Sequence, residues 1–184
     1  DCSKLSGGMS EFSPASKHHH HRTAAVAAVP TAVVTVSDTR TREDDTGGDR
    51  VCALLEAGGH PVVERRIVPD EPAAIAGALH ELTGRADVGA VVFTGGTGVA
   101  PRDVTPDTVE PLLDRLIPGF GELFRQLSYA EIGSAALLSR ALAGIRGGRV
   151  VFVLPGSRGA VKLAMEKLVL PELGHLAAEA VKTR

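Results

Sequence analysis

The chain has 184 residues, of which 43% are hydrophobic and 23% charged, and its formal net charge is −2. This length and composition predict a folded domain rather than a disordered chain. The low net charge, the 3% of aromatic residues and the lack of tryptophan argue against nucleic acid or an anionic membrane as the main partner.

The first 29 residues differ in composition from the rest, and we interpret residues 1–29 as a tag remnant followed by a flexible leader. They contain four consecutive histidines, His18 to His21, which could bind a transition metal. We favour an incidental or purification-related tract. Because no apolar run reaches membrane-spanning length and no leader with a cleavage site is visible, we expect a cytoplasmic protein.

From residue 30 onwards, short β-branched runs recur, and each predicts a strand. Three lie at residues 31–36, 62–68 and 88–94, and a last strand and turn lie at 149–157. Helical patterns separate them. This alternation predicts an α/β fold, a three-layer sandwich with a mostly parallel sheet, in one domain spanning residues 30–184.

Helix signals fill the intervals. Apolar residues at helical spacing from Val51 predict a helix that the glycine pair at 58–59 ends. A helix over 119–144 is apolar enough for a subunit interface, although the same residues could serve the core of the monomer. The segment 160–181 is helical in pattern, with Pro171 expected to break or bend it.

Two further helices have recognisable starts. Asp70 stands at an N-cap position, with Pro72 in the first turn of the helix that follows. Thr105 likewise stands as the N-cap of a helix with Pro106 at its first position.

In a parallel sheet, ligands bind beyond the carboxyl ends of the strands. The unusual residues of this sequence follow the predicted strands, so we expect their loops to line one rim. They are Ser37, Asp38, Thr39 and Arg40, then Pro69, Asp70 and Glu71, then Thr94, Gly95, Gly96, Thr97, Gly98, Arg102 and Asp103, and last Pro155, Gly156, Ser157 and Arg158.

The glycine-rich loop at residues 94–98 suits a phosphate group. Glycine lets the backbone approach a ligand closely, successive N–H groups form an anion site, and Thr94 and Thr97 add hydroxyl donors. A plain tight turn is the alternative, and we favour phosphate because the loop follows a buried strand and precedes an Arg-Asp pair. The dinucleotide motif and the P-loop motif do not occur here, which argues against a dinucleotide oxidoreductase or a P-loop ATPase.

Asp103 and Asp70 are candidate magnesium ligands, because Mg²⁺ prefers one or two carboxylates together with substrate phosphates. Asp70 could instead serve only as a helix cap, and Asp38 could hold its own loop as an Asx-turn. Most arginines are simply solvated. Four are nevertheless candidate anion binders: Arg40, Arg102, Arg140 and Arg158.

Several motifs in order resemble the MoaB/Mog family of molybdenum cofactor biosynthesis, over nearly all of residues 31–176. They are SDTRTREDDTGG at 37–48, TGGTGVAPRDVTPD at 94–107, GFGELFRQLSYAEIGSAALLSRALAG at 119–144 and VLPGSRGAVKLAMEKLVLPELGHL at 153–176. The segments SYAEIGSAALLSR and PELGHL are more similar to the MoaB branch than to the Mog branch.

The resemblance implies a molybdopterin-binding α/β domain, assembled as a trimer or hexamer. It implies an enzyme, a nucleotidyltransferase, that uses ATP and Mg²⁺ to convert molybdopterin into adenylyl-molybdopterin and pyrophosphate. Contact with the metal-insertion protein of the same pathway is also expected.

By the same resemblance, Asp70 and Asp103 are the catalytic aspartates and hold or orient Mg²⁺, and the loop at 94–98 holds phosphate and pterin. The remaining pocket residues it implies are Ser37, Asp38, Gly156 and Ser157. One departure is Arg158, which stands where we expect a proline, so the contacts of the last loop with the pterin are open.

Two other functions are compatible with these residues. The first is a non-catalytic molybdopterin-binding or carrier protein with the same pocket, which sequence cannot separate from an enzyme. The second is a nucleotide pyrophosphate hydrolase of the CinA-like type, which the expectation of a single domain disfavours.

Overall fold

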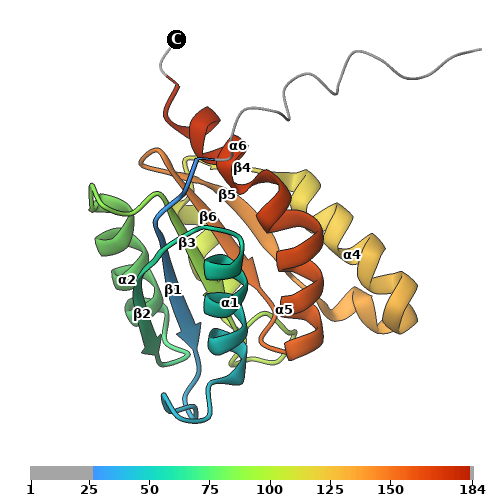
Figure 1. The fold of residues 1–184 in the computed structure, drawn as a ribbon. Coiled ribbons are helices and arrows are strands. Elements are labelled where there is room, and N and C mark those ends of the chain that lie inside the picture. The colour runs from blue at the N-terminus through green and yellow to red at the C-terminus, as the bar shows by residue number, and fades with distance from the viewer. Residues whose placement is uncertain (1–26, 183–184) are drawn as a thin grey trace, which may run out of the picture.

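The computed structural model describes residues 27–182. The interpretation of residues 1–26, including the histidine tract, lies outside this part of the chain. Six strands form one sheet in the order β2-β1-β3-β6-β5-β4 (Figure 1). Their bounds are β1 Thr31–Val36, β2 Val62–Val68, β3 Ala90–Thr94, β4 Arg115–Leu116, β5 Leu142–Arg146 and β6 Arg149–Leu154.

The first four strands of that order, β2, β1, β3 and β6, run parallel, whereas β5 is antiparallel to both β6 and β4. Every residue of β1 and β3 is buried, as expected for parallel strands covered on both faces. This confirms the prediction of an α/β fold with a mostly parallel sheet.

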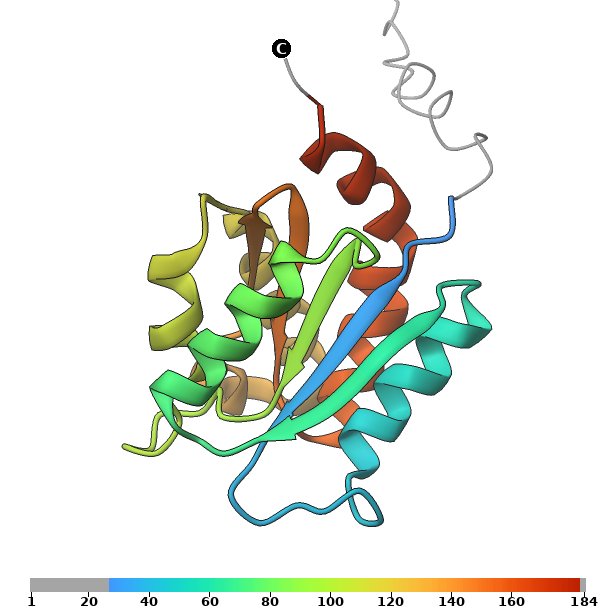
Figure 2. The ribbon, with the colours of Figure 1, turned by 90° about the vertical axis from the view of Figure 1, so that its left-hand side faces the viewer.

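Helices cover both faces of the sheet, which gives the predicted three layers (Figures 1 and 2). One face packs against α1, α4, α5 and α6, and the other against α2 and α3. The bounds are α1 Thr46–Ala57, α2 Pro72–Gly84, α3 Thr105–Val109, α4 Pro118–Ile132, α5 Arg158–Ala164 and α6 Leu170–Ala180. Three short segments complete the order: the 3₁₀ turns η1 Glu110–Leu112 and η2 Gly133–Leu138, and the π-helical η3 Met165–Val169.

The core is mainly aliphatic on both sides of the sheet. Phe120 of α4 and Phe152 of β6 form the aromatic contact of the described residues, with ring centroids 5.4 Å apart. Burial of valine, leucine and isoleucine against the two faces therefore supplies most of the hydrophobic stabilisation.

The prediction of one helix over 119–144 is wrong in its second half. The helix ends at Ile132, and Gly133 follows with φ of +66°. The chain then forms η2 and β5, and a tight hairpin joins β5 to β6 through Gly147 and Gly148. Both glycines have positive φ, at +55° and +73°, as a type I′ hairpin turn requires. The GG pair between two apolar runs was the sequence signal for this hairpin.

Pro171 lies in the first turn of α6, directly after the π-helical segment η3. The predicted break or bend near Pro171 is therefore a short π-helical segment and not a loop. Among the described residues, no helix combines the length and the apolar character needed to cross a membrane.

Candidate functional site

The four parallel strands end at one edge of the sheet, so the loops predicted to form a rim do meet. Thr35 of β1 pairs with Thr94 of β3, which in turn pairs with Leu154 of β6. The loops also touch: a Cβ on Gly47 would lie 3.0 Å from the carbonyl oxygen of Gly156, and one on Gly156 would lie 3.3 Å from Cα of Gly95. This edge lies at the bottom of Figure 1, where the β1 arrow points.

The loop after β3 requires glycine at two successive positions. Gly95 has φ of +105°, and a Cβ there would lie 2.4 Å from the carbonyl oxygen of Val36. Gly96 has φ of +63°, and a Cβ there would lie 2.4 Å from Oγ1 of Thr105 and 2.9 Å from Oδ1 of Asp70. The glycines thus let the backbone pass close beside the second strand's aspartate.

The predicted hydroxyl donors of this loop are less available than expected. Thr94 is buried, and its hydroxyl donates a hydrogen bond to the carbonyl oxygen of Pro155 at 3.1 Å. Thr97 is also buried. The hydroxyl of Thr94 therefore joins the loops after β3 and β6, and its single proton is already engaged.

Asp70 and Asp38 hold each other through the backbone. The N–H of Asp38 donates to Oδ2 of Asp70, and the N–H of Asp70 donates to Oδ1 of Asp38, both at 3.0 Å. The prediction that Asp70 caps α2 is wrong, because Glu71 occupies the N-cap position and makes no side-chain cap bond. The Asp38 carboxylate likewise reaches across to the second strand. Of the Asp70 oxygens, Oδ1 accepts no hydrogen bond from the described residues.

The pKa values of Asp70 and Asp38 shift in opposite directions. Burial and the neighbouring charge of Asp38 raise the pKa of Asp70, and Asp103 contributes to the same shift. The hydrogen bond from Arg102, followed by the N–H of Asp70, lowers the pKa of Asp38. Asp70 and Asp103 therefore lie within electrostatic reach of one another, and a cation between them would relieve their repulsion.

Asp103 lies against the far end of the glycine loop. Its Oδ2 accepts the N–H of Ala100 at 3.0 Å, and a Cβ on Gly98 would lie 2.7 Å from the same oxygen. Oδ1 accepts no hydrogen bond from the described residues. The prediction that Thr105 caps the next helix is wrong, since Val104 holds the N-cap position and no side chain caps this helix.

The four candidate arginines differ in how many protein groups their guanidinium groups already contact. Arg40 donates to the carbonyl oxygen of Asp44 at 2.7 Å. Arg102 forms ion pairs with Asp38 and, at 3.1 Å, with Glu71, and its side chain is 61% exposed. The guanidinium of Arg158 has no hydrogen-bond partner among the described residues, and this residue is exposed.

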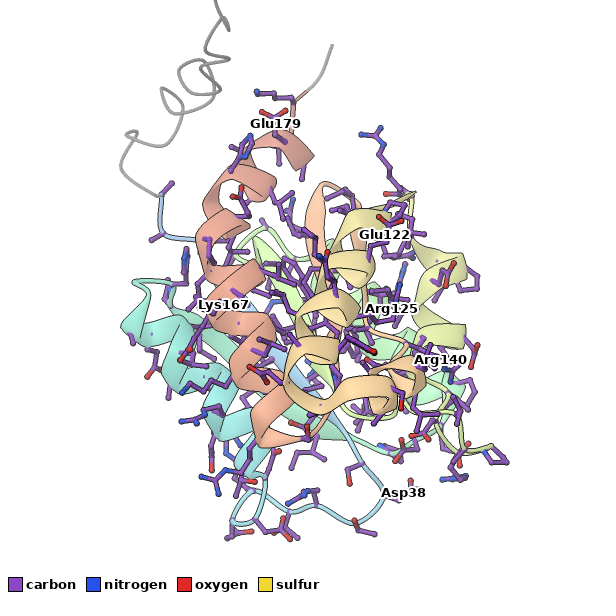
Figure 3. The ribbon with its side chains drawn as sticks, turned by 90° about the vertical axis from the view of Figure 1, so that its right-hand side faces the viewer. Asp38, Glu122, Arg125, Arg140, Lys167 and Glu179 are labelled. Carbon is purple, nitrogen blue, oxygen red and sulfur yellow. The ribbon has the colours of Figure 1, made fainter. Side chains whose placement is uncertain are left out.

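Arg140 holds the glycine loop and is not a free anion binder. Figure 3 labels the side chain of Arg140. Its Nε donates to the carbonyl oxygen of Gly98 at 2.9 Å, and its guanidinium also contacts the carbonyl oxygen of Asp103. The same group reaches both carboxylate oxygens of Asp107 at 2.8 and 2.7 Å. Its backbone N–H donates to the carbonyl oxygen of Thr97 at 3.2 Å. One arginine therefore fixes the segment that ends in Asp103.

Asp45 is a residue of this edge that the sequence analysis missed. It is 1% exposed and accepts hydrogen bonds from the Thr35 hydroxyl at 2.6 Å, the Gly48 N–H at 2.9 Å and the Arg65 guanidinium at 2.9 Å. Burial opposes its ionisation, but these donors together lower the pKa of Asp45. Asp45 is the N-cap of α1. The sequence signal that could have identified it is an aspartate directly before Thr-Gly-Gly at the start of a predicted helix, since aspartate is a preferred N-cap residue.

The two predicted serines hold their own loops. Oγ of Ser37 accepts the N–H groups of Thr39 and Arg40, each at 3.2 Å. Oγ of Ser157 accepts the N–H of Ala160 at 3.3 Å and so caps α5. Their hydroxyl protons are still available to a ligand at the rim.

Comparison with known proteins identifies the domain. A family described as a probable molybdopterin binding domain matches residues 32–175. The chain belongs to the MoaB/Mog family. Molybdenum cofactor biosynthesis protein B of Halalkalibacterium halodurans is 52% identical over 153 residues, which cover 83% of this chain and 90% of that protein. The same-named protein of Bacillus subtilis is 49% identical over 158 residues, covering 83% and 90%.

Solved structures of the MoaB/Mog family have the same fold. A crystal structure of molybdenum cofactor biosynthesis protein B is 50% identical with a TM-score of 0.83, covering 85% of this chain and 98% of that one. The tungsten cofactor synthesizing protein MoaB of Pyrococcus furiosus is 38% identical with a TM-score of 0.77, covering 86% and 100%. The Mog protein of Mycobacterium ulcerans is 26% identical with a TM-score of 0.74, covering 84% and 100%. The similarity to the MoaB branch predicted from the sequence agrees with these identities.

The residues of this MoaB/Mog chain fit a magnesium ion only together with a phosphate ligand. Between residues 27 and 182, no three His, Cys, Asp or Glu side chains are grouped closely enough to hold a metal. Mg²⁺ is commonly held by one or two carboxylates, with substrate phosphates and water completing its shell. The two oxygens of Asp70 and Asp103 that accept no hydrogen bond from the described residues match that requirement.

Proposed function

We propose that this protein acts in molybdenum cofactor biosynthesis as a molybdopterin adenylyltransferase, which converts ATP and molybdopterin into adenylyl-molybdopterin and pyrophosphate. The observation that supports this most directly is the pair Asp70 and Asp103. Each presents one carboxylate oxygen without a partner among the described residues, beside the glycine loop at residues 94–98. The names of relatives at about 50% identity support the pathway.

The proposed reaction joins two anions. A terminal phosphate oxygen of molybdopterin attacks the α-phosphorus of ATP and forms a new O–P bond. The bond from that phosphorus to the oxygen bridging the α- and β-phosphates breaks, and pyrophosphate leaves with the electron pair. A phosphate monoester has its second pKa at about 6, so the nucleophile is largely dianionic at neutral pH and needs no general base. Positioning and charge stabilisation are then the main requirements.

The residues of the rim meet those requirements in different ways. Asp70 and Asp103 would hold Mg²⁺, which when bound supplies positive charge to the phosphate oxygens. The backbone bonds between Asp38 and Asp70 fix the second-strand carboxylate, and Arg140 fixes the segment of Asp103. Arg102 has a 61% exposed side chain and forms ion pairs with Asp38 and Glu71, so its guanidinium could turn towards a phosphate.

The carrier alternative requires the same pocket but no transfer. The free oxygens of Asp70 and Asp103 favour the enzyme, because a protein that only binds a pterin phosphate has no need for two carboxylates beside an anion. The hydrolase alternative has no comparable support. A CinA protein of Thermoplasma acidophilum is 19% identical with a TM-score of 0.54, a likeness that extends to the fold alone.

We also propose that copies of this chain associate through α4 and η2, as the resemblance to a trimeric or hexameric family implies. These elements expose five large apolar side chains: Leu123 at 50%, Tyr129 at 64%, Ile132 at 60%, Leu137 at 80% and Leu138 at 56%. Exposed apolar groups that gather on neighbouring elements are typical of an interface. Light scattering of the wild type and of Leu137→Asp tests this: the variant should have the smaller mass, and a monomeric wild type would contradict the proposal.

The activity itself is tested by mass spectrometry. Purified protein is incubated with molybdopterin, ATP and Mg²⁺, and adenylyl-molybdopterin and pyrophosphate are measured. We expect both products, and we expect both to disappear on chelation of Mg²⁺ and in Asp103→Asn. The matched control is Asp87→Asn, since Asp87 lies before β3, at the opposite end of the strand from Asp103, with its carboxylate 60% exposed.

Three other outcomes would contradict parts of this proposal. Near-normal turnover in a folded Asp103→Asn variant would refute the role of Asp103. Bound pterin without product would support the carrier. Cleavage of a nucleotide pyrophosphate without pterin would support the hydrolase.

A further inference from the structure

Thr105 has a buried hydroxyl group that forms no hydrogen bond with the described residues. The residue is 0% exposed, and its Oγ1 has no hydrogen-bond partner among residues 27–182. Its backbone N–H donates to the carbonyl oxygen of Gly96 at 3.1 Å. An unpaired buried hydroxyl costs free energy, and valine would fill nearly the same space without that cost. Packing in this structure therefore does not explain a threonine at this position.

The hydroxyl faces the glycine loop from the same side as Asp70. A Cβ on Gly96 would lie 2.4 Å from Oγ1 of Thr105 and 2.9 Å from Oδ1 of Asp70, so both oxygens border the same small space. The other oxygen of Asp70 already accepts the N–H of Asp38 at 3.0 Å. Thr105 is thus a free donor next to the one Asp70 oxygen that lacks a bond among the described residues.

We propose that Thr105 is a positioning residue that donates its hydroxyl proton to Oδ1 of Asp70 when a magnesium nucleotide occupies the site. This inference rests on the proposed function, which places Mg²⁺ and ATP there. A carboxylate oxygen has two lone pairs, so it can accept a hydrogen bond and bind a cation together. Carboxylates that bind metals in proteins are usually hydrogen-bonded in this way, and losing the partner typically lowers metal affinity 10- to 100-fold.

The proposal separates stability from binding. The hydroxyl forms no hydrogen bond within the described part of the chain, so Thr105→Val should leave the melting temperature unchanged or raise it. The same variant should bind a magnesium nucleotide about 10- to 100-fold more weakly. Thr105→Ser keeps the hydroxyl and should bind about as well as the wild type, although it loses a buried methyl group. Because the hydroxyl acts through a metal-binding carboxylate, the defect of Thr105→Val should shrink as the Mg²⁺ concentration rises.

The experiment uses α,β-methylene-ATP, whose bridging carbon prevents adenylyl transfer. Its dissociation constant is measured by calorimetry at several Mg²⁺ concentrations for the wild type, Thr105→Val and Thr105→Ser, with thermal unfolding of the same samples. Weak binding by the valine variant with an unchanged or higher melting temperature, and near-normal binding by the serine variant, would support the proposal.

Two results with the variants would overturn it. One is a valine variant that binds the nucleotide as the wild type does. The other is loss of binding in parallel with loss of thermal stability in both variants, which would indicate a structural role. A wild type that binds the nucleotide but transfers no adenylate would refute the proposed function and leave this comparison valid, whereas one that binds no nucleotide would refute both.

Discussion

Replacing Arg140 by alanine tests whether this arginine holds the glycine loop or binds an anionic ligand. The side chain is 33% exposed and contacts two backbone carbonyls and one carboxylate of the segment that includes Asp103. Arg140→Ala removes all of these contacts at once. The matched control is Arg158→Ala, which truncates an exposed arginine at the same edge that has no hydrogen bond to the described residues.

The expected cost follows from the surroundings of each contact. A hydrogen bond from a charged donor contributes about 1.5–3 kcal/mol, but the partner carboxylate of Asp107 is 66% exposed, so that ion pair contributes at most about 1 kcal/mol. Water can replace part of what the half-buried carbonyls lose. We therefore expect a loss of about 2–3 kcal/mol in the free energy of unfolding, or about 4–12 °C in Tm for a chain of this size.

The effect on turnover should exceed the effect on stability. A displacement of about 1 Å in a catalytic group can reduce the rate about 100-fold, and Arg140 fixes the backbone of Asp103 itself. The assay combines thermal unfolding, calorimetry with ATP and Mg²⁺, and the rate of adenylyl-molybdopterin formation. An unchanged Tm with weakened ATP binding would refute the reasoning, because that is the pattern of a free anion binder. Arg140→Lys should be intermediate in Tm, since one ammonium group cannot reach every partner of the guanidinium.

Three further predictions concern the rest of the molecule. The Nδ1 of buried His60 accepts the N–H of Val29 at 3.1 Å, and burial lowers the pKa of this imidazole. The free energy of unfolding should therefore be highest above pH 6.5 and decline as the pH falls towards the folded-state pKa. Between pH 7.5 and 5, the free energy of unfolding should depend less steeply on pH in His60→Asn than in the wild type. Asp45→Asn removes the buried partner of Arg65 and should lower the unfolding free energy by about 3–5 kcal/mol in denaturant titrations; a loss below about 1 kcal/mol would contradict a buried ion pair. Gly96→Ala places a Cβ on a left-handed backbone against a carboxylate oxygen, so it should abolish nucleotide binding in calorimetry, and normal binding would show that the loop rearranges freely.

Local patterns determined most of the fold. The strands at 31–36 and 62–68 have the predicted bounds, because β-branched runs bounded by polar or glycine-rich segments have few other stable conformations. The loops of the rim were likewise predictable, since parallel strands end at one edge. The prediction of one helix over 119–144 was wrong because the apolar spacing continues beyond Ile132, where the helix ends. Residues 142–146 pair with β6 instead, which buries their apolar side chains in the sheet.

The arrangement of the site depended on contacts between distant parts of the chain. Asp70 looked like a helix cap from its neighbours, yet its backbone and carboxylate bond to Asp38, 32 residues earlier. Arg140 looked like a free cation, yet the partners of its side chain lie 33 to 42 residues away. The sequence by itself determined most of the residues that reach the rim, because that depends on where each strand ends. Only the tertiary structure decided which of their polar groups bond to one another and which stay free for a ligand, because each group bonds to whatever partner the packed strands and loops bring within about 3 Å.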